Sequence, residues 1–180
     1  MKKIILFLIV FAGAMNLCAQ SVMGIDFGSS YETVKSKLQE RVGEFHFIES
    51  SGKLECLSGI ALGGFDFDYA DFEFQYGNGS SYFNYAYFEK RYTLDAVRIA
   101  IKDRDFLFSL LKDKYVSEFV DNYTNEDGYK CYRFGLNPKD KESVLGQIIL
   151  EKAEGKDGKK RLYLCLRYGP IYYIDKASDF

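Results

Sequence analysis

Apolar positions in residues 30–42 recur every fourth residue, which places them on one face of a helix. Ser29 and Glu32 have the spacing of a capping box, in which both side chains bond free backbone amides. Gly43 is the residue type that commonly ends a helix in a left-handed conformation. The pattern therefore predicts a helix over residues 30–42. Its apolar face consists of Val34, Leu38 and Val42.

Residues 44–92 show the period of two that is typical of strands. Apolar residues take odd positions over 65–69 and even positions over 72–76, so the alternation slips by one residue between these segments. Because such a slip turns every side chain to the other face of a sheet, we expect a bulge or tight turn at 69–71. A Gly-Asn-Gly turn then predicts a hairpin that leads into an aromatic strand over residues 81–88.

The middle of the chain allows two interpretations. Apolar residues follow an alternating spacing of three and four from Leu94 to Tyr115, and Thr93 is a suitable N-cap, so this pattern predicts one long helix. Residues 97–101 also alternate between apolar and other positions, as they would in a strand. The sequence therefore leaves residues 94–102 open between helix and strand, whereas the second half of the segment is predicted to be helical.

The last third of the chain again has the pattern of strands separated by turns, which Asp-Gly and Asn-Pro pairs mark. The element order predicts an α+β fold of two helix-then-antiparallel-meander halves, with the helices packed on an antiparallel sheet. The halves, residues 24–92 and 93–174, could be a diverged repeat within a single domain of residues 20–180. The expected strands are 118–123, 129–134, 143–151, 160–167 and a short 171–174.

The first residues of the chain have the order of a secretory signal peptide. Lysines at positions 2–3 precede twelve apolar or small residues, and Leu17 and Cys18 then lead to an alanine suited to the last position before cleavage. This run is shorter than the roughly 18 apolar residues of a membrane-spanning helix. We expect a signal peptide over residues 1–19, cleaved near Ala19, and an exported domain, periplasmic or extracellular, without an integral membrane span. Lipoprotein signals have a small residue where this chain has Leu17, so we expect no lipid anchor at Cys18.

Charge and cysteine content restrict the partners of the chain. The net charge is −2 at pH 7 with both signs interspersed, so we expect neither nucleic acid nor an anionic membrane as the main partner. Loss of Cys18 leaves Cys56, Cys131 and Cys165, an odd number in an oxidising compartment. Cys131 and Cys165 lie in the middle of expected strands and could form a disulfide if those strands are neighbours. The alternative is that the thiols are free and buried.

No motif in the sequence identifies a catalytic or metal site. The chain has one histidine, His46, which alternation places on the polar side of a short strand, and a Ser-His-Asp or Cys-His arrangement would have to use it. Acidic residues between positions 66 and 73 alternate with apolar residues, which is typical of a half-buried strand rather than of convergent metal ligands. We therefore expect no catalytic residue, no metal and no cofactor. The acidic residues are Asp66, Asp68, Asp71 and Glu73.

Aromatic content is the most unusual feature of the composition, with 15 tyrosines and 16 phenylalanines but no tryptophan. Over residues 82–88, aromatic side chains occupy both faces of one expected strand. If a helix covers one face, the other is either covered by a second layer or exposed to a partner. Since tyrosine is enriched at protein interfaces, the second possibility predicts an interaction face at Tyr82, Tyr85 and Tyr87.

One segment near the start of the expected domain resembles a known kind of protein. Residues 25–38 begin Ile-Asp-Phe-Gly-Ser and continue with Thr33, Val34 and Leu38. This order is similar to the first helix of outer-membrane assembly lipoproteins of the BamE (SmpA/OmlA) kind and of β-lactamase-inhibitor-protein-like domains. The resemblance covers about fifteen residues. It implies short helices against an antiparallel sheet and a role in binding other proteins, and it carries over no functional residue.

These observations together predict an exported, non-enzymatic module that binds another protein of the cell envelope or extracellular space. The alternative is a small-ligand or glycan-binding protein that uses an aromatic pocket between helix and sheet. The first function would show an open sheet surface, whereas the second would show a cavity lined by tyrosines.

Overall fold

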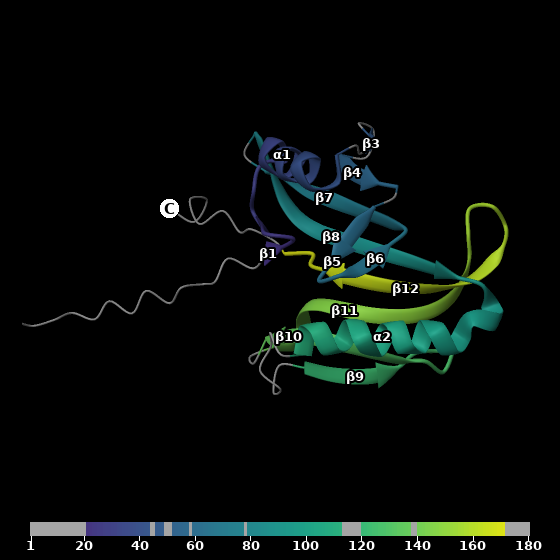
Figure 1. The fold of residues 1–180 in the computed structure, drawn as a ribbon. Helices are drawn as coiled ribbons and strands as arrows, with labels where there is room; N and C mark the ends of the chain where they lie inside the picture. Colours follow the sequence, from purple (N-terminus) through teal and green to yellow (C-terminus); the bar gives the residue numbers. More distant parts are fainter. Residues whose placement is uncertain are drawn as a thin grey trace, which may run out of the picture.

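The computed structural model describes residues 21–43, 46–48, 52–57, 59–77, 79–112, 120–137 and 140–171. In this part of the chain, eight strands form one antiparallel sheet in the order β3-β4-β7-β8-β12-β11-β10-β9, and two short hairpins, β1–β2 and β5–β6, lie outside it (Figure 1). The strands are β1 (Ser21–Val22), β2 (Ile25–Asp26), β3 (His46–Ile48), β4 (Lys53–Cys56), β5 (Ile60–Leu62), β6 (Phe65–Phe67), β7 (Tyr69–Gly77), β8 (Ser80–Tyr92), β9 (Val120–Thr124), β10 (Lys130–Asn137), β11 (Asp140–Glu154) and β12 (Lys160–Tyr168). The helices are α1 (Tyr31–Val42), the 3-10 turn η2 (Leu94–Ala96) and α2 (Val97–Lys112).

One face of the sheet forms the hydrophobic core, and α1, α2 and the β5–β6 hairpin lie on that face (Figure 1). Phe72 of β7, Phe88 of β8 and Leu164 of β12 are fully buried there. They belong to the same cluster as Leu38 of α1 and Leu107 of α2. Because strand side chains alternate between faces, the polar residues between these apolar ones point to the other face of the sheet.

Both predicted helices are present. Helix α1 confirms the helix expected over residues 30–42, and Gly43 follows it with a φ of 75°. The helical interpretation of residues 94–102 is also confirmed, because η2 and the first turns of α2 cover them. Thr93 is the residue before η2, but its side chain makes no capping hydrogen bond there. The expected end of this helix, after Lys112, lies outside the described residues.

The N-cap of α1 is one residue later than predicted. Ser30 Oγ accepts the backbone N–H of Thr33 at 3.3 Å, so Ser30 caps the helix, and the capping box expected at Ser29 and Glu32 is wrong. The backbone of Ser29 is used elsewhere, since its carbonyl accepts the N–H of Phe83 on β8 at 2.9 Å. This contact with the sheet holds Ser29 outside the helix.

Two irregularities set the phase of the aromatic strands. The expected slip occurs at Asp68, one residue before the predicted 69–71, where the chain bends out of the β5–β6 hairpin into β7. A second irregularity was not predicted: the pairing of β8 with β7 skips Asn84, which forms a β-bulge. The bulge changes which side chains of β8 share a face.

The fold class expected from the sequence is wrong. The expectation was α+β, with two helix-then-antiparallel-meander halves, whereas the structure is mainly β and built on one continuous sheet. The pairing of β8 with β12, from Tyr92 and Leu162 to Ala86 and Tyr168, joins both parts of the chain. Hydrophobic periodicity shows which residues form a strand, but not which distant strand it pairs with, so this joining was not visible in the pattern.

Some expectations fall on residues outside the described ranges. These are the signal peptide over residues 1–19, the lipid anchor at Cys18 and most of the short strand at 171–174. Among the residues that are described, no helix is both long enough and apolar enough to cross a membrane.

Candidate functional site

The face of the eight-stranded sheet that points away from α1 and α2 carries tyrosines and charged side chains, and we call it the open face. Its one small buried cluster contains residues of β10, β11 and β12 and no helical residue among those described. The chemistry of this face follows from alternation, since apolar residues of the same strands point to the core. The tyrosines of the open face are Tyr69, Tyr82, Tyr85, Tyr87, Tyr123 and Tyr163.

The structure also brings the three tyrosines of the predicted interaction face to this surface. Tyr85 and Tyr87 are partly exposed and lie on the open face by simple alternation. Tyr82 has the opposite parity, but the bulge at Asn84 compensates for it. Tyr82 pairs with Gln75 of β7, and Tyr85 pairs with Glu73. Gln75 and Glu73 are two residues apart on one strand, so both tyrosines lie on the same side of the sheet.

One row of polar side chains crosses the open face from β4 to the edge strand β9. Residues directly opposite each other in antiparallel strands share a face, and the registers of six strand pairs connect this row. Carboxylates stand at the β4 and β7 positions, whereas arginines stand at β12 and β10. At the far end of the row, Asp121 of β9 pairs with Arg133, so the β4 and β7 end of this row carries the unbalanced negative charge. The row consists of Glu55, Asp71, Tyr87, Arg167, Gln147, Arg133 and Asp121, from β4 to β9.

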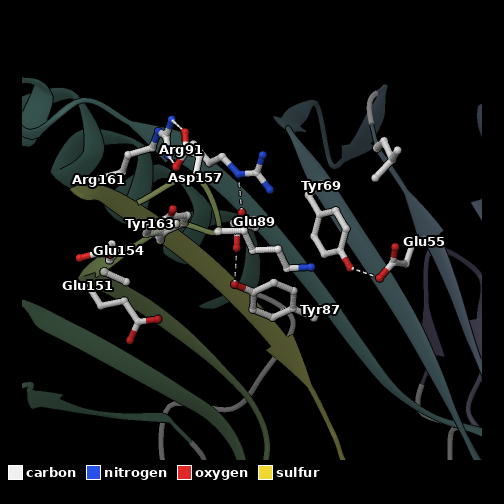
Figure 2. Close-up of a pocket in the computed structure, with 14 residues that line it drawn as sticks. Glu55, Tyr69, Tyr87, Glu89, Arg91, Glu151, Glu154, Asp157, Arg161 and Tyr163 are labelled. Atoms are coloured by element: carbon white, nitrogen blue, oxygen red, sulfur yellow. Dashed lines mark hydrogen bonds and ion pairs between the residues drawn. The ribbon is translucent and has the colours of Figure 1, made fainter. Parts of the chain in front are cut away.

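A cleft of about 640 Å³ opens on this face, bounded by residues of β4, β7, β8, β11 and β12 and by the loop that joins β11 to β12 (Figure 2). Its volume lies within the range of ligand sites in proteins. Figure 2 shows tyrosine rings in its walls, with carboxylates and cations around them. The lining includes Tyr69, Tyr87, Tyr163 and Leu57, the carboxylates Glu55, Glu89, Glu151, Glu154 and Asp157, and the cations Arg91, Lys156 and Arg161.

Two carboxylates share one hydrogen-bond donor at the β4 side of the cleft. The Tyr69 hydroxyl lies 2.8 Å from Glu55 Oε1 and 3.2 Å from Asp71 Oδ2, but it has a single hydrogen to donate. The Asp71 side chain is 10% exposed, and its Oδ1 atom is buried without a hydrogen-bond partner among the described residues. Burial raises the pKa of Asp71 to about 6; Lys53, 3.6 Å away, opposes this rise and Glu73 adds to it.

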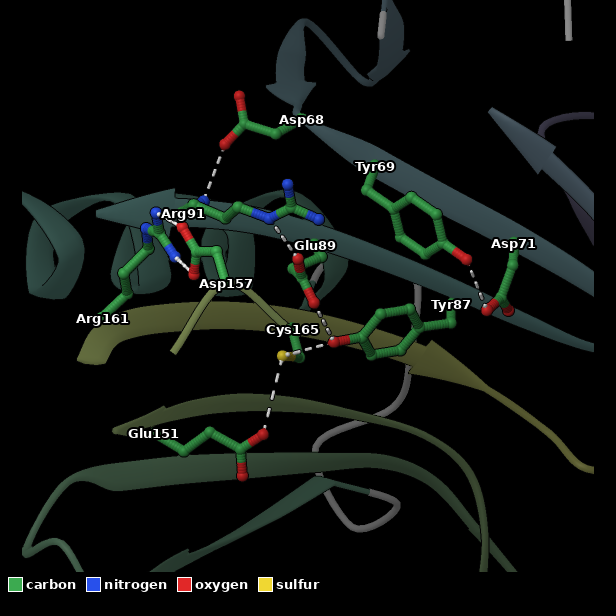
Figure 3. Close-up of polar contacts among 10 residues, drawn as sticks. All are labelled: Asp68, Tyr69, Asp71, Tyr87, Glu89, Arg91, Glu151, Asp157, Arg161 and Cys165. Atoms are coloured by element: carbon green, nitrogen blue, oxygen red, sulfur yellow. Dashed lines mark hydrogen bonds and ion pairs between the residues drawn. The ribbon is translucent and has the colours of Figure 1, made fainter. Parts of the chain in front are cut away.

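A second hydrogen-bond chain fixes Tyr87 at the floor of the cleft (Figure 3). Its hydroxyl donates to Glu89 Oε2 at 2.8 Å, and Arg91 Nε donates to the other oxygen of Glu89 at 2.6 Å. Cys165 Sγ lies 3.1 Å from the same hydroxyl. Burial, followed by the nearby thiol and carboxylate, raises the pKa of Tyr87, so the phenol keeps its proton and remains a donor.

The described cysteines carry free thiols. Cys131 of β10 and Cys165 of β12 lie on either side of β11, and Ile149 pairs with Cys165 and packs with Cys131. Two strand spacings come to about 9–10 Å, whereas disulfide-bonded Cα atoms lie within about 7 Å. The neighbouring strands that the predicted disulfide requires are therefore not present. Burial raises the pKa of Cys165 to about 12 and that of Cys56 to about 11, which keeps both thiols protonated and weakly nucleophilic.

The other residues considered for chemistry are dispersed. His46 lies on β3, where it pairs with Glu55 through the backbone register. Asp66 lies on the β5–β6 hairpin, and Asp68 accepts the backbone N–H of Arg91 at 2.7 Å. Within the described ranges, no group of three or more histidine, cysteine or acidic side chains is placed to hold a metal ion.

Sequence reasoning missed most of the charged residues that form the cleft. Glu55, Glu89 and Glu151 occupy the polar phase of their strands, and this alternation was the available signal. They meet at one cleft only because β8 pairs with β12, which no local pattern encodes.

A scan against protein-family models and searches of curated proteins and of solved structures found no match to this chain. The geometry and chemistry of the open face are therefore the basis on which a function can be assigned.

Proposed function

We propose that this protein is an exported, non-catalytic module that binds another protein through the open face of its sheet. The observation that supports this proposal is the tyrosine-rich face itself, on the side of the sheet to which neither described α-helix packs. Tyrosine and arginine are enriched among the residues that dominate binding at protein interfaces. Tyr85, Tyr87 and Arg167 lie together on this face, because Tyr87 pairs with Arg167.

Contacts within the protein already hold tyrosine side chains of the open face in place, and this also supports an interface. Tyr69 and Tyr87 pack edge to face, with ring centroids 6.3 Å apart, and carboxylates accept hydrogen bonds from both hydroxyls. Side chains that are already held in place lose less conformational freedom when a partner arrives. This face therefore offers rigid aromatic contacts at a low entropic cost.

The remaining parts of the proposal have separate support. Export is supported by the signal-like pattern of residues 1–19, and protein binding by the resemblance of residues 25–38 to exported protein-binding domains. Burial raises the pKa values of Cys56 and Cys165 and keeps both thiols protonated, which disfavours a nucleophilic role for either of them.

The alternative, a ligand pocket between helix and sheet, has weaker support. A cavity of about 480 Å³ lies between α2 and strands β9 and β10, and Tyr132 is the one tyrosine among the described residues that line it. The ring of Tyr132 stacks on Phe108 with centroids 3.9 Å apart, so one face of this ring is already occupied. The larger tyrosine-lined cleft lies on the open face instead.

A pull-down with matched tyrosine variants tests the proposed face. The immobilised protein is incubated with an envelope extract of the source organism, and captured proteins are quantified by mass spectrometry. We expect Tyr85→Ala to reduce the specifically captured protein at least tenfold while the melting temperature stays nearly unchanged. Truncating an aromatic residue that dominates an interface typically costs about 2 kcal/mol or more, and a tenfold loss of affinity corresponds to about 1.4 kcal/mol.

Tyr76→Ala is the matched control, because Tyr76 is 78% exposed on β7 and two residues from the core-facing Phe74. We expect this variant to capture as much protein as the wild type. Capture by Tyr85→Ala at the wild-type level would contradict the proposal. A melting temperature that falls in proportion to the lost capture would instead make Tyr85 a core residue.

A further inference from the structure

The charges of the cleft are unevenly paired. Arg91 Nε lies 2.6 Å from Glu89, and Arg161 Nη2 lies 2.6 Å from Asp157, so these two cations are neutralised within the protein. Three further carboxylates line the same cleft. Glu55 and Glu154 have no cationic partner among the described side chains, and the nearest cation to Glu151 is Arg167 Nη2, at 3.8 Å. Against these carboxylates stands one further lining cation, Lys156.

A buried acceptor next to the cleft also indicates an excess of acceptors over donors. Asp71 lies behind Glu55 and Tyr69, with nine-tenths of its side chain buried and its Oδ1 atom unpartnered among the described residues. Buried polar atoms in native proteins are nearly always hydrogen-bonded. Tyr69 supplies one hydrogen to two carboxylates, and Lys53 is the one cation beside Asp71 among the described residues and is shared with Glu73. The β4 side of the cleft thus has more acceptors than donors.

The positions of the carboxylates set the length of a ligand that could donate hydrogen bonds to both ends of the cleft. Glu55 lies on β4 and Glu151 on β11, which are four strand steps apart in the sheet order. At about 4.8 Å per step, the two strand positions lie about 19 Å apart across the strands. Glu151 is also displaced by four residues, about 13 Å, along β11 from Gln147, which stands level with Glu55 in the polar row. An extended peptide advances about 3.3 Å per residue and would cover the resulting diagonal of about 23 Å with about seven residues. A free amine or a single metal ion could satisfy one end but not both.

The walls between these carboxylates suit the stems of long basic side chains. Leu57 is 56% exposed at the rim, and the rings of Tyr69 and Tyr87 lie between the two ends of the cleft (Figure 2). Lysine and arginine stems pack along apolar surface while their charged groups reach acceptors, and their cations also bind aromatic faces.

We propose that the cleft binds an extended basic segment of the partner protein, with lysine or arginine side chains that reach Glu55 at one end and Glu151 at the other. This inference rests on the proposed function and adds the chemical class of the partner. The segment supplies the donors that the cleft lacks, and the open face around Tyr85 contacts the rest of the partner.

Fluorescence anisotropy with synthetic peptides tests this proposal on the full-length protein. The probe is a labelled peptide of about seven residues, with a lysine at each end and uncharged serine and threonine residues between them. A second probe has glutamate at both ends, and a third has lysine at one end. We expect the two-lysine peptide to bind at least tenfold more tightly than the one-lysine peptide, and the glutamate peptide not to bind measurably.

Charge-neutral variants locate the binding site. Glu55→Gln and Glu151→Gln should each weaken binding of the two-lysine peptide about tenfold, because glutamine keeps the shape of the side chain but removes its charge. Glu40→Gln on α1 is the control for general electrostatic attraction, since Glu40 is exposed on the helix that covers the opposite face. This variant should bind like the wild type.

The outcomes separate the two proposals. Equal binding of lysine and glutamate peptides, or equal effects of Glu40→Gln and Glu55→Gln, would overturn the basic-segment proposal. Equal binding of the one-lysine and two-lysine peptides, or full competition by free lysine or calcium at matched concentration, would overturn it as well. If the peptides fail while Tyr85→Ala still abolishes capture in the pull-down, the open face remains the interface and its partner has different chemistry.

Discussion

The carboxyl group of Asp71 shows how one buried charge on the open face can reduce the stability of the fold. Its pKa rises from 3.8 to about 6, mainly because the side chain is buried. The folded protein therefore holds this proton more tightly than the unfolded chain between about pH 4 and pH 6. Within that window the free energy of unfolding falls as the pH rises. A shift of about two pKa units corresponds to roughly 2–3 kcal/mol at neutral pH.

Asp71→Asn should remove this penalty and keep the shape of the side chain. We expect the variant to be more stable than the wild type by about 1–2 kcal/mol at pH 7.5 and nearly equal to it at pH 4, where the wild-type carboxyl is protonated. Urea unfolding at both pH values measures the difference. Asp66→Asn, at an exposed position on β6, is the control and should change neither value. A variant less stable than the wild type at pH 7.5 would show that the Asp71 charge stabilises the fold through Lys53.

At the scale of elements, the start of α1 can be tested by comparing two adjacent serines. Ser30 Oγ accepts the Thr33 N–H, whereas Ser29 bonds β8 through its backbone. Ser30→Ala should lower the free energy of unfolding by about 1 kcal/mol, the usual cost of a lost N-cap, and Ser29→Ala should have little effect. Chemical denaturation of both variants decides the point. The reverse order would restore the capping box predicted from the sequence.

Close packing between strands gives a stronger test at Gly146 of β11. A Cβ atom there would lie 2.3 Å from the Arg167 carbonyl oxygen and 2.4 Å from Phe134 Cζ. Because the carbonyl belongs to the neighbouring strand, it cannot move without disrupting the sheet. Gly146→Ala should cost about 3 kcal/mol or more, at the upper end for overpacking. Gly77→Ala, where a Cβ would meet no atom within 4 Å, is the control and should leave the thermal melting temperature nearly unchanged.

The elements differ in how far the sequence determines them. The helix at residues 30–42 and the strands around the Asp-Gly turns follow from short-range periodicity and turn chemistry, and both are present. The common face of Tyr82 and Tyr85 could be proposed from composition, but its cause, the bulge at Asn84, depends on how β8 pairs with β7 and has no local signal. The unequal pairing of charges in the cleft could not be predicted from the sequence either, because it depends on distances between side chains of five strands.

At the scale of the whole molecule, the pairing of β8 with β12 has the largest consequence. It makes one sheet from strands that lie far apart in the sequence, and it builds the cleft from both parts of the chain. Leu162, Leu164 and Leu166 of β12 belong to the same buried cluster as Phe72 and Phe88 of the earlier strands. With a shared core and continuous hydrogen bonding, local loss of packing in one part should be transmitted to the other.

Hydrogen exchange of a core variant tests this coupling. Phe72 is fully buried on β7, and Phe72→Ala should cost about 3–5 kcal/mol. If the sheet unfolds as one unit, the slowest amides of β10 and β11 should exchange at least about 100-fold faster, by the same factor as those of β7. Leu164→Ala on β12 should likewise accelerate exchange in β7. Acceleration confined to the mutated part would show two separately stable halves, and the cleft between them would then open without global unfolding.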